Sequence, residues 1–125
     1  MAGWIAVDLD GTLADWSGWR ADGSIGDPIP AMVNRVKRWL REGKDVRIFT
    51  ARVWPYGTTM SAESARVMGV AGQLAAIRHW CREHLGEVLP ITCIKDPDMI
   101  ELWDDRAVTV KRNLGTPVDP MMENH

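Results

Sequence analysis

The sequence predicts a single α/β domain, specifically a Rossmann-like three-layer sandwich with a mainly parallel sheet. Short apolar runs begin near residues 4, 45, 91 and 100, and segments with helical spacing separate the first three. The 125-residue chain has neither internal repeats nor linker-like stretches, and this length supports one hydrophobic core. We therefore expect one domain over residues 1–115 and a C-terminal tail over residues 116–125.

The first half of the chain is expected to form a strand, a helix and a second strand. Residues 4–9 are mostly apolar, as in a buried strand of a parallel sheet. Pro28 and Pro30 lead into a helix that Gly43 ends, and residues 45–50 form the next strand. A right-handed crossover between parallel strands is the expected geometry. The helix has apolar residues at helical spacing: Met32, Val33, Val36, Trp39 and Leu40.

The second half of the chain predicts a loop, a long helix and short strands. Pro55 and Gly57 mark residues 53–60 as a loop, and residues 61–85 continue with helical spacing. Gly69 and Gly72 weaken this helix and can divide it. The expected strands that follow are residues 91–94 and 100–103, with residues 108–110 as a last edge strand.

Composition and cysteine content exclude some classes of protein. A net charge of −2 and a charged fraction of 26% give no general attraction to nucleic acid or acidic membranes. Cys81 and Cys93 lack metal-ligand spacing, so buried thiols are expected rather than a disulfide. The sequence has no apolar run of membrane-spanning length and no signal-peptide pattern. We therefore expect a cytoplasmic protein without a membrane partner.

The segment Asp8-Leu9-Asp10-Gly11-Thr12 places two carboxylates one residue apart where the first strand ends. In an extended segment, the side chains of Asp8 and Asp10 point to the same face and repel each other unless a cation intervenes. Gly11 permits a sharp turn, and Thr12 and its neighbours offer a hydroxyl and N–H groups to phosphate. A simple Asp-Gly turn at a strand end is the alternative interpretation.

Polar side chains follow four of the predicted strands. In a parallel sheet these strand ends share one edge, where ligands bind. Carboxylates without His or Cys favour Mg²⁺ rather than zinc, and a Lys and a Thr can hold phosphoryl oxygens. The side chains expected to converge are Asp8 with Asp10, Thr50, Lys95, and Asp104 with Asp105.

The order of these residues resembles the four motifs of the haloacid dehalogenase superfamily of phosphohydrolases. The segment from Asp8 to Leu13 is similar to the first motif, Thr50 to the second, Lys95 to the third, and Asp104-Asp105 to the fourth. The combination of residues 50–52 with residues 104–106 resembles the phosphatase half of bacteriophage polynucleotide kinases. Residues 14–30 and 53–60 are too short for the cap that family members insert there, so the resemblance implies a capless enzyme.

The resemblance implies an activity and a role for each residue. Asp8 is the expected nucleophile, Asp10 the general acid and base, and Thr50 and Lys95 stabilise the transferred phosphoryl group. The cofactor implied is Mg²⁺. Its expected ligands are the side chains of Asp8 and Asp104 and the backbone carbonyl of Asp10, with Asp105 acting through water or by orienting Lys95. The expected substrate-binding residues are Gly11, Thr12, Ala51, Arg52 and Arg106.

The expected substrate is a nucleotide or polynucleotide-end phosphate, since aromatic residues near the site, with Arg52 or Arg106, can stack on a base and pair with a phosphate. An open site admits a phosphorylated small molecule or a phosphorylated nucleic-acid end, and a second copy of the chain can also cover it. Trp16, Trp19 and Trp54 either line the substrate site or form an interface. Besides a phosphomonoester hydrolase, a non-catalytic phosphate- or metal-binding module with the same fold is the alternative. A receiver domain is disfavoured, because there the phosphorylated Asp lies on a later strand than the acidic pair.

Overall fold

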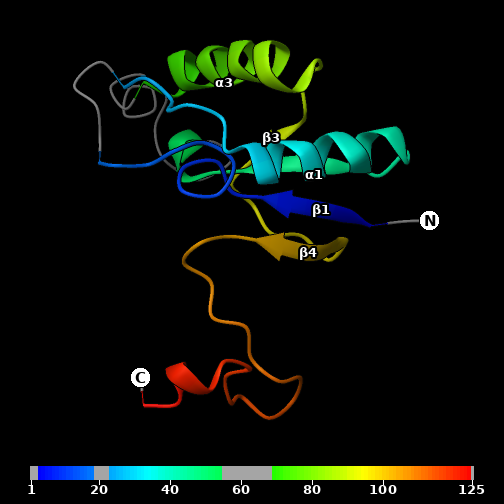
Figure 1. The fold of residues 1–125 in the computed structure, drawn as a ribbon, viewed down its shortest axis with the longest axis vertical. Helices are drawn as coiled ribbons and strands as arrows, with labels where there is room; N and C mark the ends of the chain where they lie inside the picture. Colours follow the sequence, from blue (N-terminus) through cyan, green and yellow to red (C-terminus); the bar gives the residue numbers. More distant parts are fainter. Residues whose placement is uncertain (1–2, 19–22, 55–68, 125) are drawn as a thin grey trace.

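The chain folds around one four-stranded parallel sheet. The structure is a computed structural model and describes residues 3–18, 23–54 and 69–124. The strand order is β3-β2-β1-β4, and every pair of neighbouring strands is parallel (Figure 1). The strands are β1 (Trp4–Val7), β2 (Val46–Phe49), β3 (Ile91–Thr92) and β4 (Met99–Trp103).

Two α-helices cover one face of this sheet (Figure 1). Helix α1 (Pro30–Arg41) has Pro30 in its first turn, and helix α3 (Val70–Leu85) begins after Gly69. The two helices contact each other and share one apolar core with Ile5 and Val7 of β1. Both crossovers, from β1 to β2 and from β2 to β3, run in the same direction across the sheet. Right-handed crossovers of this kind place their helices on the same face.

On the opposite face of β1, Trp4 contacts the connection between β3 and β4. Trp4 alternates with Ile5 along the strand and therefore points away from the helices. Its indole N–H donates to Asp96 Oδ1 at 2.8 Å, and the Arg47 guanidinium lies 4.7 Å from its ring centre. The connection from β3 to β4 therefore brings Asp96 back to the start of β1, where it contacts Trp4 on this face.

Residues 108–110 do not form the expected edge strand. Val110 makes an isolated bridge to Pro117, and the N–H of Val118 donates to the carbonyl of Thr109 at 2.8 Å. Because Pro117 has no N–H, this pairing cannot extend into a ladder at that position. The C-terminal residues turn back on themselves beyond β4 (Figure 1), and a short 3-10 helix, η2 (Pro120–Met122), follows in the expected tail.

The structure also bears on the expectations for the cysteines, the second helix, the cap and a membrane span. Cys81 is buried and Cys93 is half-buried. The expected helix over residues 61–85 is described only from Val70, since residues 61–68 lie outside the described residues. The expected absence of a cap stays a prediction, because residues 19–22 and 55–60 of the two insertion points lie outside them too. None of the described helices is long and apolar enough to cross a membrane.

Candidate active site

Three carboxylates meet where β1 and β4 end. Val7 is in register with Trp103, so the next residues, Asp8 and Asp104, lie level on neighbouring strands. The N–H of Asp8 donates to the carbonyl of Trp103 at 2.9 Å, which fixes this alignment. One carboxylate oxygen from each of Asp8, Asp104 and Asp105 lies within 4.8 Å of the others. The parallel register therefore brings together acidic residues that are far apart in the sequence.

The surroundings of Asp8 disfavour its charged form. Burial is the largest cause, and together with the neighbouring Asp104 and Asp105 it raises the pKa of Asp8 to about 7. The backbone N–H of Leu9 acts in the opposite direction by donating to the Asp8 carboxylate. A divalent cation among the three carboxylates would offset this repulsion. The all-oxygen ligand set fits Mg²⁺, which prefers carboxylates over sulfur or imidazole.

The turn after β1 is built around the carboxylate of Asp105. Gly11 has a φ of +88°, and a Cβ at this position would lie 2.5 Å from Asp105 Oδ2. The hydroxyl of Thr12 accepts a hydrogen bond from the N–H of Asp105 at 3.1 Å. Glycine is therefore required at position 11 both for the backbone conformation and for the close approach of Asp105.

The N–H groups of Gly11 and Thr12 are used within the turn itself. The N–H of Gly11 donates to the carbonyl of Ala14 at 2.8 Å, and that of Thr12 donates to the carbonyl of Leu9 at 3.3 Å. In the structure these two N–H groups hold the turn in place, because a backbone N–H committed to a carbonyl is not available to phosphate. That Gly11 and Thr12 bind substrate stays a prediction, which now depends on the Thr12 hydroxyl.

Thr50 lies at the end of β2, beside the acidic cluster. The residue is only 2% exposed, and its Oγ1 accepts a hydrogen bond from the N–H of Arg52 at 3.1 Å. This contact begins the short 3-10 helix η1 (Ala51–Val53) and leaves the hydroxyl proton of Thr50 free for a ligand oxygen. Ala51, the next residue, lines the same pocket as Thr50.

A pocket of about 270 Å³ joins the ends of β1, β2 and β4. Arg106 lines it, and the backbone N–H of this residue donates to Asp104 Oδ1 at 2.7 Å, which orients that carboxylate. Trp16 also lines the pocket, which gives it an aromatic wall. The other lining residues are Asp8, Asp10, Phe49, Thr50, Ala51, Arg52 and Asp104.

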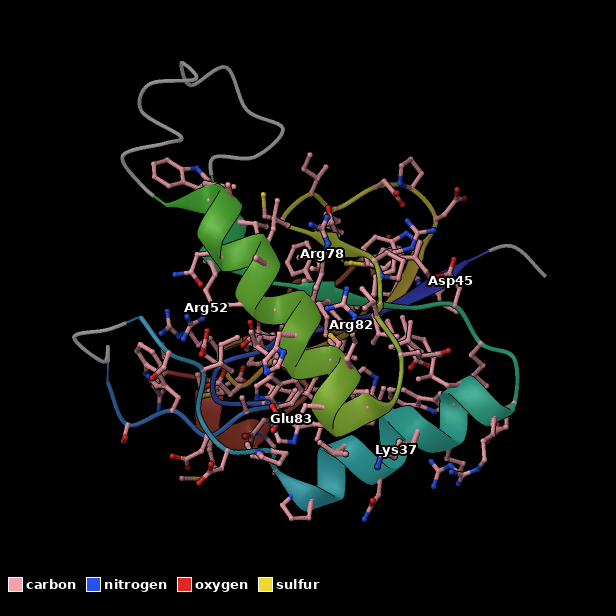
Figure 2. All side chains as sticks on the ribbon, turned by 90° about the horizontal axis from the view of Figure 1, so that it is seen from above. Lys37, Asp45, Arg52, Arg78, Arg82 and Glu83 are labelled. Carbon is pink, nitrogen blue, oxygen red and sulfur yellow. The ribbon has the colours of Figure 1, made fainter. Side chains whose placement is uncertain are left out.

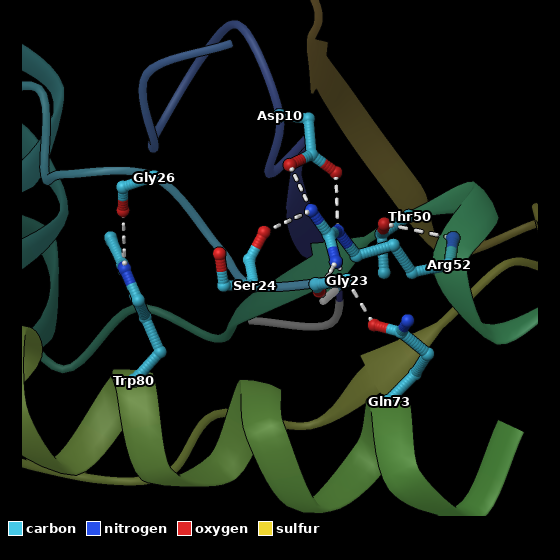
Figure 3. A network of polar contacts seen from close by, with 8 residues as sticks. All are labelled: Asp10, Gly23, Ser24, Gly26, Thr50, Arg52, Gln73 and Trp80. Carbon is cyan, nitrogen blue, oxygen red and sulfur yellow. Dashed lines mark hydrogen bonds and ion pairs between the residues drawn. The ribbon is translucent and has the colours of Figure 1, made fainter. Parts of the chain in front are cut away.

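Asp10 is paired with Arg52. The Arg52 Nε donates to Asp10 Oδ2 at 2.7 Å, and its Nη2 donates to Asp10 Oδ1 at 2.9 Å. Asp10 is separate from the three carboxylates that cluster, since its side chain faces this guanidinium (Figure 3). The metal role expected of Asp10 belongs to its backbone carbonyl, so the pairing with Arg52 does not compete with that role.

Lys95 is not brought to this pocket. Strand β3 ends at Thr92, and the following residues turn away toward the start of β1, where Asp96 binds the Trp4 indole. Lys95 is exposed and is not among the residues that line the pocket. The expectation that Lys95 lies at a converging strand end is therefore wrong, since the third strand is too short to carry this residue to the shared edge.

The sequence did not decide where the tryptophans lie, and it did not indicate the partners of Arg52. Trp16 lines the pocket, Trp54 is 49% exposed outside its lining, and Trp19 lies outside the described residues. Gln73 and the carbonyls of Gly23 and Ser24 contact Arg52. No pattern in the sequence signals these contacts, because a backbone carbonyl carries no residue-type information and Gln73 lies among ordinary helical positions.

Comparisons with known proteins support the fold only. The chain matches no protein-family model, and it matches no curated protein. A solved structure of a conserved protein from Bacteroides thetaiotaomicron is similar, with a TM-score of 0.51 and 22% sequence identity. The alignment covers 86% of this chain and 79% of that protein. Together with the observed parallel sheet, this similarity confirms the Rossmann-like α/β class.

Proposed function

We propose that this chain is a Mg²⁺-dependent phosphomonoester hydrolase of the haloacid dehalogenase type. The observation that carries the proposal is the convergence of Asp8, Asp104 and Asp105 within 4.8 Å. Thr50 supplies a hydroxyl in the same pocket, and Asp10 lies beside it as a fourth carboxylate. The order of the motifs adds support for a type similar to the phosphatase half of bacteriophage polynucleotide kinase.

The donor set suits a magnesium ion. Asp8, Asp104 and Asp105 would hold the ion together with the backbone carbonyl of Asp10. When bound, Mg²⁺ supplies positive charge that offsets the repulsion between the Asp8 carboxylate and a phosphate dianion. The Asp104 carboxylate is held for this role by the N–H of Arg106, and the Asp105 backbone is held by Thr12.

The reaction consists of two displacements at phosphorus. A carboxylate oxygen of Asp8 forms a bond to phosphorus while the ester P–O bond breaks, and the leaving oxygen takes a proton from Asp10. Water then attacks the aspartyl-phosphate, Asp10 takes its proton, and the Asp8 carboxylate and inorganic phosphate are released. Thr50 and Arg106 donate to the phosphoryl oxygens, where charge must be stabilised in phosphoryl transfer.

The substrate is proposed to carry its phosphate on a nucleotide or at a polynucleotide end. An aromatic side chain, Trp16, and a cation, Arg106, line the same pocket, and together they can stack on a base and pair with phosphate. A phosphorylated small molecule is the other substrate class. A second copy of the chain can cover the pocket. Cys81 and Cys93 lack C-x-x-C spacing, which favours buried thiols in a reducing cytoplasm.

The decisive experiment compares the replacement of Asp8 in the pocket with the replacement of Asp45 at the opposite end of the sheet. Hydrolysis of an aryl phosphate is measured with and without Mg²⁺ in the wild type, Asp8→Asn and Asp45→Asn. Asp45 precedes β2, far from the pocket, and pairs with Arg47. We expect Mg²⁺-dependent turnover in the wild type and Asp45→Asn, and a loss of at least about a thousandfold in Asp8→Asn. If Asp8→Asn still hydrolyses the aryl phosphate, Asp8 is not the nucleophile.

The alternative is a binding module with the same site and no turnover. It predicts that Mg²⁺ and inorganic phosphate bind but that no phosphoester is hydrolysed. Assays over nucleotides, 3′- and 5′-phosphorylated oligonucleotides and sugar phosphates distinguish the two functions and also test the substrate. A clear preference for sugar phosphates contradicts the proposed substrate class.

A further inference from the structure

Arg52 is buried beside the pocket, and the structure gives each of its N–H groups an acceptor. The residue is 5% exposed, and its guanidinium carries five N–H donors. Two of them bind the carboxylate oxygens of Asp10 at 2.7 and 2.9 Å. The others reach the carbonyls of Gly23 at 2.8 Å and Ser24 at 3.2 Å, and Gln73 Oε1 at 3.0 Å (Figure 3).

These contacts join three parts of the chain that are separate in sequence. Asp10 belongs to the turn after β1, Gln73 belongs to α3, and residues 23–26 form a segment that we call the strap. A second contact fastens the strap to α3, because the Trp80 indole N–H donates to the carbonyl of Gly26 at 3.0 Å (Figure 3). Arg52 therefore lies at the point where the strap, the turn and the helix meet.

We infer that Arg52 is a positioning residue that fixes Asp10 and the strap, and that it does not bind the phosphate of the substrate. This inference rests on the proposed function. A guanidinium that already donates all five hydrogen bonds can bind phosphate only by breaking some of them. Arg106 lines the same pocket, and among the described residues no acceptor contacts its guanidinium. Of the two arginines among the described residues that line the pocket, Arg106 is thus the one left to pair with phosphate.

The geometry explains how Arg52 acts on the reaction through Asp10. A two-point contact between a guanidinium and a carboxylate fixes the plane of the carboxylate as well as its position. Each Asp10 oxygen keeps a further lone pair, which can carry the proton that Asp10 gives to the leaving group and can later accept the proton of the attacking water. Without Arg52 the Asp10 side chain can rotate, and proton transfer depends steeply on such placement. The residue that controls proton transfer is therefore separate from the residue that binds phosphate.

Arg52→Lys tests this inference, with Arg47→Lys as the matched control. Arg47 makes the same two-point contact, with Asp45 at 3.1 and 2.9 Å, and Figure 2 shows Asp45 and Arg52 on opposite sides of the molecule. On an alkyl phosphate, whose leaving group needs a proton, we expect kcat of Arg52→Lys to fall by about 10- to 100-fold. On an aryl phosphate, the loss should stay within about threefold, and KM should be unchanged for both. Arg47→Lys should behave as the wild type.

Two kinetic results would contradict the positioning role of Arg52. Equal losses on both substrates, together with a tenfold weaker inhibition by inorganic phosphate, would make Arg52 a phosphate ligand. A double variant of Asp10→Asn and Arg52→Lys should be no slower than Asp10→Asn alone, because the two residues act as a unit. If the losses in kcat of the two single variants add up in the double variant, Asp10 and Arg52 act independently and the inference is wrong.

A measurement without turnover separates this inference from the proposed function. Amide hydrogen exchange is followed at Gly11, which donates to Ala14, and at Asp15, which donates to Asp27. Arg52→Lys should accelerate exchange at both amides by about tenfold and leave Val36 of α1 unchanged, whereas Arg47→Lys should change neither. If the wild type hydrolyses no phosphoester, the proposed function fails. Unchanged exchange in Arg52→Lys shows separately that Arg52 does not fix the turn.

Discussion

The hydroxyl of Thr12 accepts a hydrogen bond of 3.1 Å from the backbone N–H of Asp105, and this contact ties the turn after β1 to the end of β4. Gly11, one residue earlier, allows the Asp105 carboxylate to approach the same turn. The two acidic ends of the site are thus held together by protein contacts. A mutation in the turn should therefore change metal affinity even though the turn side chains are not metal ligands.

Replacing Thr12 by valine should weaken Mg²⁺ binding. Thr12→Val removes the acceptor of the Asp105 N–H while nearly keeping the volume, so the loss should be about 1 kcal/mol or several-fold in Mg²⁺ affinity. Thr12→Ser keeps the oxygen and should bind Mg²⁺ as the wild type does. Calorimetric titration measures both affinities. Equal affinities in the two variants would show that the contact does not support the acidic cluster.

Replacing Gly11 by alanine should affect both stability and metal binding. The φ of +88° and the contact with Asp105 Oδ2 oppose a Cβ, and we expect a loss of about 1–3 kcal/mol in the free energy of unfolding. Mg²⁺ affinity should fall by at least about tenfold, because Asp105 must move.

Gly86→Ala is the control for Gly11→Ala. Gly86 has nearly the same φ, +85°, but no atom lies within 4 Å of the Cβ that it would gain. Its replacement should reduce the free energy of unfolding and leave Mg²⁺ affinity unchanged. A similar loss of Mg²⁺ affinity in both variants would contradict the specific role of Gly11.

The stability of the metal-free protein should depend on pH through Asp8. Burial, followed by the charge of Asp104, raises the pKa of Asp8 to about 7 from an ordinary value of 3.8. Between these values the folded state holds more protons than the unfolded state, so the free energy of unfolding falls as the pH rises from about 4 to about 7. We expect about 1–2 kcal/mol, less than the full shift implies, because Asp8 is partly exposed.

Chemical denaturation at several pH values measures this dependence. Asp8→Asn should remove the Asp8 contribution, and Mg²⁺ should stabilise the wild type more at pH 8 than at pH 5, where protonation competes with the cation. An identical pH dependence in the wild type and Asp8→Asn would contradict the raised pKa.

Arg106 and Lys95 should differ in their importance for turnover. Arg106 lines the pocket, so Arg106→Gln should lower kcat/KM by about 10- to 100-fold and weaken inhibition by inorganic phosphate. Lys95 is exposed and leads toward the far end of β1, so Lys95→Gln should change kcat/KM by less than about threefold. Steady-state kinetics decide between them. Loss of activity in Lys95→Gln would restore the role that the sequence motif suggests for this lysine.

Much of the fold was predictable because strand and helix periodicity depends on local sequence. The apolar run of β1 and the helical spacing of α1 place both elements within a few residues of their observed bounds. The edge strand predicted at residues 108–110 was wrong. Its apolar residues fit the strand pattern, but whether such a segment joins the sheet or pairs locally with residues 116–118 depends on long-range geometry.

The candidate site was predictable where it follows directly from strand ends. Asp8 and Asp104 each follow a strand, and the parallel register aligns them. Lys95 was misplaced because the rule assumes that the strand continues to the residue, whereas β3 ends at Thr92. The saturated hydrogen bonds of Arg52 could not be predicted, since they depend on backbone carbonyls and on a helix that tertiary packing brings together.

The sequence by itself determined the α/β class and the acidic residues at the ends of β1 and β4, because side-chain periodicity and residue chemistry are local properties. The tertiary structure alone decided how the charged residues divide their contacts. Asp8 joins the carboxylate cluster and Asp10 faces Arg52, although the two are only one residue apart. Which partner a charged side chain meets depends on distances across the folded molecule, and these are set by strand register and helix packing.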